Sequence, residues 1–160
     1  MPVLISRQQA IAKLEKEIPQ GACLLCHVSK QHNYILHKGK HTTVLLSEYP
    51  RCWGQIMVMV NRHVVSFTEL HTEEWAELLT NVQKATLCAE AVLKPFRCYV
   101  AAIGSADNLL MTTPHIHFNI IPIYNKQDKP SNIFTWEHGV YSGSKEEFED
   151  LLGELNIFWK

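Results

Sequence analysis

The sequence predicts an α+β protein, in which an antiparallel sheet of about five strands is combined with one long helix and shorter terminal helices. Three observations predict this class: five β-like runs lie between residues 34 and 123, one long helical segment interrupts them, and a capping box opens a helix near each end. At 160 residues the chain can form a hydrophobic core without disulfides. We therefore expect a single domain over residues 1–160.

The first element is predicted to be a short helix. Ser6 and Gln9 have the spacing of a capping box, in which each side chain bonds the backbone of the other residue. Apolar residues then recur at helical intervals until Pro19 and Gly21 break the pattern.

Three strands are predicted next. Residues 34–37 and 42–46 have β-like composition, and Gly39 between them can supply a positive φ for a tight hairpin turn. Residues 55–60 form a third, more buried run. The order predicts a hairpin followed by a central strand.

A long helix separates these strands from the remaining ones. Thr72 is a plausible N-cap, and a helical apolar period continues from it to Pro95. Residues 97–103 then favour a strand, and Ser144 and Glu147 form the capping box of a final helix.

The last predicted strand, residues 115–123, carries the most informative pattern in the chain. Alternation along a strand places His115, His117 and Asn119 on one face. The other face carries the apolar side chains Ile116, Phe118 and Ile120. A strand anchored by its apolar face can present two imidazoles and a carboxamide to one small ligand or metal.

Two cysteines near the N-terminus, Cys23 and Cys26, allow three interpretations. They form a redox pair, a coincidental spacing, or half of a zinc site. Structural zinc prefers four cysteine and histidine ligands in a tetrahedron, and His63 and His115 at predicted strand ends are able to complete such a set.

His117 is the natural candidate for a nucleophile, because it is central on the polar face. An imidazole held through one nitrogen by a carbonyl keeps a lone pair on the other nitrogen, which can attack phosphorus. Asn119 and the hydroxyl of Thr112 are suited to donate hydrogen bonds to phosphate oxygens.

Composition excludes several classes of partner. The net charge is −1 and the cations are spread along the chain, so we expect no nucleic-acid partner. No apolar run is long enough to span a membrane. The five cysteines are irregularly spaced and no secretory signal is recognisable, which predicts a reducing, cytoplasmic location.

The final strand resembles the signature of the histidine-triad superfamily, His-φ-His-φ-His-φ-φ with φ apolar, written here as His115-Ile116-His117-Phe118-Asn119-Ile120-Ile121. The early Cys-x-x-Cys pair, the strand that ends before His63 and the long helix follow the order of that superfamily. The resemblance covers most of the chain and implies its antiparallel fold.

The resemblance also implies site residues and partners. Zinc-containing members hold a structural zinc ion with residues that correspond to Cys23, Cys26, His63 and His115. The middle histidine, here His117, forms a covalent nucleotidyl-histidine at the α-phosphorus of a nucleotide or nucleotide conjugate. Members of this kind form homodimers through the long helix and the neighbouring strand.

Three positions concern substrate binding or depart from the superfamily pattern. Asn119 replaces the third histidine, and Gln55 replaces a histidine common before the upstream strand. Galactose-1-phosphate uridylyltransferase carries Gln at the third position, so Asn119 resembles a shorter version of that carboxamide. Ser47 corresponds roughly to an acidic residue that contacts ribose. Together with Thr112, Gln55 and Ser47 are therefore predicted to contact the nucleotide.

These observations leave three hypotheses. The first is a nucleotide hydrolase or nucleotidyltransferase that uses His117 as its nucleophile. The second is a catalytically weak module that binds or senses nucleotides and contains a structural zinc. The third is a metal-dependent phosphohydrolase in which His115 and His117 bind one metal ion that activates water.

Overall fold

The computed structural model describes residues 1–31, 34–102, 114–135 and 138–160, and these confirm the predicted α+β class. The strands are β1 (Val3–Ile5), β2 (Ile35–Lys38), β3 (Thr42–Leu46), β4 (Ile56–Val60), β5 (Arg97–Ala101), β6 (His117–Ile123) and β7 (Val140–Ser142). The helices are α1 (Arg7–Glu17), α2 (Leu24–Gln31), the 3-10 turn η1 (Phe67–Glu69), α3 (Thr72–Leu93), α4 (Pro130–Phe134) and α5 (Lys145–Phe158).

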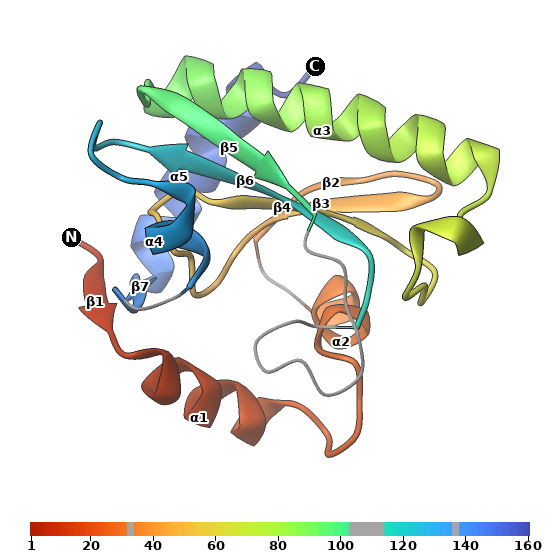
Figure 1. Ribbon diagram of the computed structural model, residues 1–160, viewed down its shortest axis with the longest axis horizontal. Helices are drawn as coiled ribbons and strands as arrows, with labels where there is room; N and C mark the ends of the chain where they lie inside the picture. The colour runs from red at the N-terminus through yellow and green to blue at the C-terminus, as the bar shows by residue number, and fades with distance from the viewer. Residues whose placement is uncertain (32–33, 103–113, 136–137) are drawn as a thin grey trace.

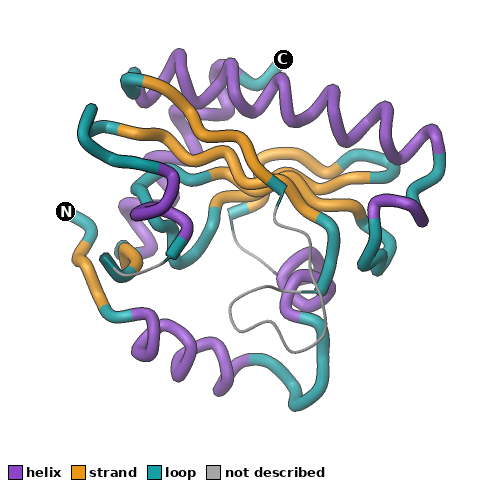
Figure 2. Tube along the Cα trace, viewed as in Figure 1, coloured by secondary structure: helices purple, strands orange, loops and turns teal. Residues whose placement is uncertain are grey.

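The five-stranded sheet has the strand order β2-β3-β4-β6-β5, and each neighbouring pair is antiparallel. Helix α3 lies along one face of this sheet, and α2 lies beneath the other face (Figure 1). The sheet twists between these helices (Figure 2). Strands β1 and β7 form a separate two-stranded sheet beside it. Strand β5 is an edge of the larger sheet.

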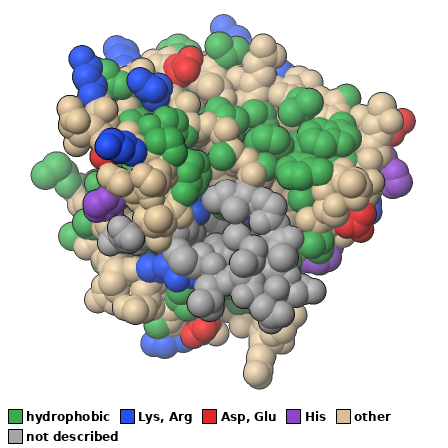
Figure 3. All heavy atoms as spheres, viewed as in Figure 1, with side chains coloured by type: hydrophobic (Ala, Val, Ile, Leu, Met, Phe, Trp, Pro, Cys, Tyr) green, Lys and Arg blue, Asp and Glu red, His purple; other side chains and the backbone are tan. Residues whose placement is uncertain are grey.

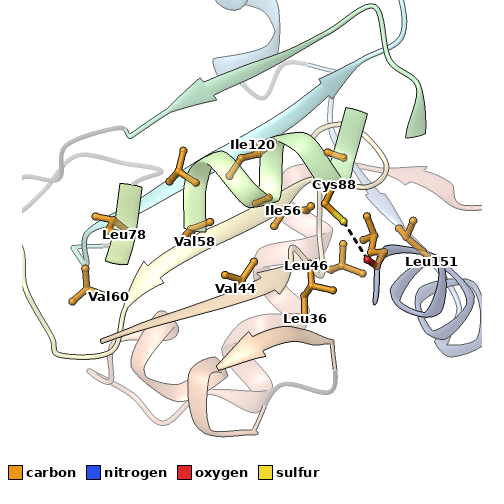
Figure 4. Packing of buried hydrophobic residues seen from close by; sticks show 14 of the residues in the cluster. Leu36, Val44, Leu46, Ile56, Val58, Val60, Leu78, Cys88, Ile120 and Leu151 are labelled. Carbon is orange, nitrogen blue, oxygen red and sulfur yellow. Dashed lines mark hydrogen bonds between the residues drawn. The ribbon is translucent and has the colours of Figure 1, made fainter. Parts of the chain in front are cut away.

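The main core lies between the sheet and helices α3 and α5. Alternate residues of β4, Val58 and Val60, point toward α3 and pack with Leu78 of that helix and Ile120 of β6 (Figure 4). Cys88 belongs to the same core, where its thiol donates to the carbonyl of Leu155 in α5 at 3.2 Å. Because β-strand side chains alternate, the intervening residues of β4 face the opposite side of the sheet.

The helix signals in the sequence are largely confirmed. Capping boxes open α1 at Ser6 and α5 at Ser144, as predicted. The N-cap of α3 is His71 and not Thr72, because the Glu74 carboxylate accepts a hydrogen bond from the His71 amide at 2.9 Å. Lys94 ends α3 in the left-handed conformation, one residue before proline.

The predicted hairpin forms, but the reason given for its glycine is wrong. Gly39 does not have a positive φ. A Cβ atom at this position would collide with the carboxylate of Glu77, which accepts hydrogen bonds from the backbone amides of His41 and Thr42. Gly39 therefore leaves room for the Glu77 carboxylate of α3 to bond the hairpin backbone.

Other differences are confined to element boundaries and short elements. Strand β6 begins at His117, two residues later than predicted, because the amide of Ile116 donates to Val64 instead of entering the ladder with β4. The short elements β1, β7, α2 and α4 were not predicted. None of the helices within the described ranges has both the length and the apolar character needed to cross a bilayer.

Candidate active site and metal centre

The polar face of β6 lies on the side of the sheet opposite α3. His117 pairs with Met59 of β4, and Asn119 pairs with Met57. Met57 and Met59 pack with residues of α2, whereas Ile121, the next residue on this face of β6, packs with residues of α4. His117 and Asn119 therefore lie between two apolar clusters.

A candidate metal centre lies at the start of β6. Its four potential ligand atoms come from Cys23 just before α2, Cys26 in the first turn of α2, His63 after β4 and His115 before β6, and all lie within 4.8 Å of one another. Packing of Leu25 in α2 against Leu45 and Met59 of the sheet brings the cysteines to the histidines. The structure thus brings together the four residues that the sequence predicts as zinc ligands.

The geometry of this centre fits a tetrahedral zinc ion. Bond lengths of about 2.3 Å to sulfur and about 2.0 Å to nitrogen place neighbouring S and N ligands about 3.5 Å apart. The His115 Nδ1 atom lies 3.5 Å from Cys23 Sγ and 3.4 Å from Cys26 Sγ, and His63 Nδ1 lies 3.4 Å from Cys26 Sγ. The donor set and its spacing both suit zinc.

Hydrogen bonding fixes which nitrogen of His115 faces the thiols. Its Nε2 donates to the carbonyl oxygen of Val60 at 2.6 Å, so its Nδ1 lone pair is directed toward the cysteines. Metal-bound histidines commonly make such a second contact, which sets the tautomer and the ring orientation. His115 itself is almost completely buried, with 1% of its surface exposed.

The cysteine pair favours one thiolate. Burial alone would raise the pKa of Cys23, but its contacts with His115 and Cys26 outweigh burial and lower the pKa to about 6. Burial and the neighbouring Cys23 sulfur raise the pKa of Cys26 to about 11. A thiolate is the form of cysteine that binds metal. The lowered pKa of Cys23 therefore favours the form that binds a metal cation.

His117 has the anchored geometry expected of a nucleophile. Its Nδ1 donates to the carbonyl oxygen of His115 at 2.7 Å, which leaves the lone pair on Nε2. Burial lowers the pKa of His117, and the nearby His115 and Arg51 lower it further. The imidazole is therefore neutral at pH 7, the form that can attack an electrophile.

Asn119 and Gln55 form a buried pair of carboxamides. The Gln55 Nε2 atom donates to Asn119 Oδ1 at 2.8 Å, and the two side chains are 3% and 2% exposed. The Oε1 atom of Gln55 accepts from the amide of Arg51 at 2.9 Å. Each carboxamide is thus oriented by a neighbour, and the Asn119 NH2 group keeps a donor for a ligand.

Of the other two residues predicted to contact the nucleotide, Ser47 and Thr112, the structure describes only Ser47. Ser47 is buried and follows β3, where its amide donates to the carbonyl of Gln55 at 2.9 Å. It therefore lies beside the carboxamide pair. Thr112 lies outside the described residues.

Arg51 is the site residue that the sequence analysis missed. Its guanidinium carbon lies 5.8 Å from the ring centroid of Phe134 in α4, the helix that packs on Ile121. Burial lowers the pKa of Arg51 to about 10, a value at which it remains charged at pH 7. No periodicity or motif marks this residue, because only the loop geometry after Pro50 brings its amide to the Gln55 carboxamide, which bonds Asn119.

The geometry disfavours one metal shared by His115 and His117. Within the part of the chain that the structure describes, the group of potential metal ligands includes His115 but not His117. The two ring nitrogens of His115 are directed at the cysteines and at Val60, while Nδ1 of His117 is bonded to a backbone carbonyl. This arrangement disfavours the third hypothesis, a phosphohydrolase in which His115 and His117 bind one metal ion.

Solved structures share this fold at low sequence identity. A hypothetical histidine triad nucleotide-binding protein from Sulfolobus tokodaii is 22% identical with a TM-score of 0.67, covering 85% of this chain and 91% of its own. A Zn-bound histidine triad family protein from Mycobacterium smegmatis is 20% identical with a TM-score of 0.62, covering 84% and 93%. A uridylyltransferase is 16% identical with a TM-score of 0.68, covering 96% of this chain and 50% of its own.

No curated protein matches the chain. A family match does exist: the HIT domain matches residues 28–126, well over half of the sequence. The matched span includes both strands that form the site and the long helix between them, whereas Cys23 and Cys26 lie before it. On the basis of this match, the chain belongs to the HIT domain family.

Proposed function

We propose that this protein is a nucleotide hydrolase or nucleotidyltransferase that works through a covalent nucleotidyl-histidine at His117. The observation that carries the proposal is the hydrogen bond from His117 Nδ1 to the His115 carbonyl at 2.7 Å, together with a lowered pKa. A histidine triad nucleotide-binding protein and a uridylyltransferase among the similar structures support a nucleotide as the ligand.

The reaction has two displacements at the α-phosphorus. The Nε2 atom of His117 attacks phosphorus, a P–N bond forms, and the P–O bond to the leaving group breaks with its electron pair going to the departing oxygen. Water or another hydroxyl acceptor then attacks the same phosphorus and loses its proton to solvent, while the P–N electron pair returns to Nε2. Hydrolysis and transfer differ only in this acceptor.

The carboxamides and loop donors stabilise the charge on the non-bridging phosphate oxygens. Asn119 lies one strand repeat from His117 on the same face of β6 and donates through its amide. Gln55 orients that amide, and Ser47 and Thr112 supply further contacts to the nucleotide. These four residues are the ones that the sequence predicts to act on or contact the nucleotide.

A zinc ion held by Cys23, Cys26, His63 and His115 is proposed to be structural. When bound, zinc supplies a rigid cross-link between α2, the end of β4 and the start of β6. His115 connects this centre to catalysis, because its side chain belongs to the metal site and its carbonyl accepts the hydrogen bond from His117. We expect zinc loss to act mainly through this positioning and through stability.

The chain is further proposed to be a single domain that forms a homodimer through β5 and α3. Strand β5 is an edge of the sheet, and Val100 on it is 42% exposed. On α3, Leu79 and Leu87 are 50% and 60% exposed. Figure 3 shows hydrophobic side chains spread over the face on which β5 runs. Unpaired edges and apolar patches of this kind are suited to subunit contacts.

The direct test is intact-protein mass after brief incubation with a panel of nucleotide conjugates, quenched in base to preserve a P–N bond. Wild-type protein is expected to gain the mass of one nucleotidyl group. His117→Ala is expected to gain none, whereas His71→Ala, which removes an exposed histidine at the start of α3, should still form the adduct.

One observation favours a catalytically weak binding module as the second candidate. The buried Gln55 and Asn119 carboxamides cannot carry a proton to a leaving group as an imidazole can. If wild-type protein binds nucleotides but gives neither adduct nor product with any conjugate, the enzymatic proposal is wrong and this second function takes its place.

A further inference from the structure

The cysteine pair at the start of α2 has a geometry that suits a disulfide as well as a metal ion. The carbonyl of Cys23 accepts a hydrogen bond from the amide of His27 at 3.0 Å, so Cys23 is the N-cap of α2 and Cys26 its third helical residue. Side chains at these two positions meet, as they do in a capping box. The two sulfur atoms lie within 4.8 Å of one another. They need to approach by less than about 3 Å to form an S–S bond of about 2.05 Å.

The metal centre is open to solvent on one side. His115 is almost completely buried, whereas His63 is exposed and both cysteines are partly exposed. Helix α2, which carries the pair, lies on the outside of the sheet face opposite α3 (Figure 1). A small molecule in solution can therefore reach these two sulfurs, as the reaction of a thiolate with an oxidant requires.

The remaining cysteines have different surroundings. Cys52 and Cys88 are buried, in separate apolar clusters, and Cys98 packs against the main core from β5. Within the ranges that the structure describes, none of these three belongs to the group of potential metal ligands. Only the pair in α2 joins two accessible thiols to that group.

Metal binding and disulfide formation exclude one another at this pair. Zinc is bound by thiolates, and the sulfur of a disulfide has no negative charge to offer it. Oxidation of the pair would leave two of the four ligands, His63 and His115, whereas structural zinc sites use four. A change in thiol oxidation is therefore also a change in metal occupancy.

We propose that Cys23 and Cys26 form a redox switch, which a low-molecular-weight disulfide such as oxidised glutathione converts to a protein disulfide with release of the metal ion. This inference rests on the zinc centre of the proposed function and adds its regulation. The thiolate of one cysteine attacks the small disulfide, forms a mixed disulfide and displaces one small thiolate. The second cysteine then attacks the protein sulfur of the mixed disulfide and displaces the other small thiolate. The two cysteines thus lose two electrons, the small disulfide gains them, and zinc leaves as the hydrated ion.

The switch reaches the proposed nucleophile through His115. The ring of His115 is held by the Val60 carbonyl on one side and by the cysteine sulfurs on the other, and its own carbonyl accepts the hydrogen bond from His117. Oxidation removes one of the two contacts that orient the ring. Loss of such an outer contact typically costs 10–100-fold. We therefore expect adduct formation at His117 to be about tenfold slower or more in the oxidised protein.

Mass spectrometry and zinc release test the switch without requiring turnover. We would load the protein with zinc, incubate it in glutathione buffers of increasing oxidised fraction, alkylate the remaining thiols and digest with trypsin. Cleavage after Lys16 and Lys30 gives a peptide that contains Cys23 and Cys26 and no other cysteine. This peptide is expected to escape alkylation and to lose two hydrogen atoms, while a chromogenic chelator detects one zinc ion per chain. A reductant should restore both thiols and zinc binding.

Two variants separate this pair from the other thiols. Cys26→Ser is expected to form no internal disulfide and to accumulate the mixed disulfide at Cys23. Cys98→Ser is the matched control, because Cys98 is also partly exposed but lies outside the ligand group, and it should respond as wild type does. Since Cys26→Ser also removes a metal ligand, the wild-type titration decides the question independently of this variant.

Three results in wild type would overturn the switch. They are failure to bind zinc, retention of zinc and both thiols in fully oxidised glutathione, and release of zinc without the disulfide in the Cys23–Cys26 peptide. An adduct at His117 in the reduced protein together with any of these would leave the covalent chemistry intact. A disulfide formed with zinc release, without any adduct in the reduced protein, would retain the switch and remove the covalent mechanism.

Discussion

At the scale of single residues, the site depends on which nitrogen of each imidazole is occupied. His115 directs Nδ1 toward two thiols because its Nε2 is bonded to a carbonyl, whereas His117 donates to a carbonyl through Nδ1 and carries its lone pair on Nε2. Two histidines separated by one residue thus have opposite nitrogens available. This difference separates the proposed metal ligand from the proposed nucleophile on one strand.

Asn119 is proposed to limit the chemistry at His117, because a carboxamide cannot act as a general acid. Asn119→His would introduce a group able to protonate a leaving amine, so we expect turnover of a nucleoside phosphoramidate to rise about tenfold or more. Asn119→Gln is the control, since it retains a carboxamide. Steady-state kinetics of both variants, with melting temperatures as a check on folding, would measure the effect. Equal rates in the two variants would contradict it.

The metal centre makes a second prediction at this scale. His63→Ala removes one of four ligands, so we expect zinc affinity to fall at least about tenfold and the melting temperature to fall with it. Metal content by atomic emission and competition with a chromogenic chelator would measure this. His27→Ala alters a histidine next to Cys26 that is not in the ligand group and should retain zinc. Retention of full zinc affinity by His63→Ala would disprove the ligand set.

At the scale of elements, the start of α3 is fixed to the loop that carries His63. The carboxylate of Glu74 accepts two hydrogen bonds from Arg62, at 3.0 and 2.8 Å, and a third from the amide of His71. Arg62 also donates to the carbonyl of Glu69 in η1 at 2.8 Å. One carboxylate therefore joins the helix, its N-cap and the residue preceding a proposed metal ligand.

This carboxylate predicts a pH dependence of stability. The hydrogen bonds from Arg62 lower the pKa of Glu74 from 4.5 to about 2, and the His71 amide lowers it as well. A group whose pKa is depressed in the folded state stabilises the fold above its unfolded pKa, and this contribution is lost as pH falls through the folded value. The loss should therefore occur between about pH 5 and pH 2.

Glu74→Gln is expected to lower the melting temperature by roughly 2–5 °C at pH 7, with the difference from wild type disappearing toward pH 2. Thermal denaturation across this range would measure it. Glu73→Gln is the matched control, because Glu73 lies in the same helical turn and has a similar relation to the helix dipole. A constant difference between Glu74→Gln and wild type at all pH values would rule out the ionic explanation.

At the scale of the whole molecule, β5 and α3 determine the expected assembly. Leu87→Lys places a charge on the exposed face of α3, so we expect it to shift a dimer toward the 18.4 kDa monomer in sedimentation velocity. Ile157→Lys is the control, since Ile157 on α5 is 72% exposed and lies outside the proposed interface. If wild type is already monomeric at the highest concentration tested, the dimer proposal is wrong.

The elements that could be predicted are those whose signal is local and repeated. The long helix and the strands of the main sheet carry several turns or alternations each, and capping boxes fix where α1 and α5 begin. Strands β1 and β7 are each three residues long, too short for a period, and they exist because each pairs with the other across the chain. Such pairing has no local signature in the sequence.

The sequence by itself determined the class of fold, the polar face of β6 and the candidate ligands Cys23, Cys26, His63 and His115, because residue type and period are local properties. Only the tertiary structure decided that those four ligand atoms meet within 4.8 Å and that Gln55 bonds Asn119. It also placed Arg51 beside the site. These contacts join segments distant in the chain, and packing of helices on the sheet, rather than any local pattern, sets the distances between them.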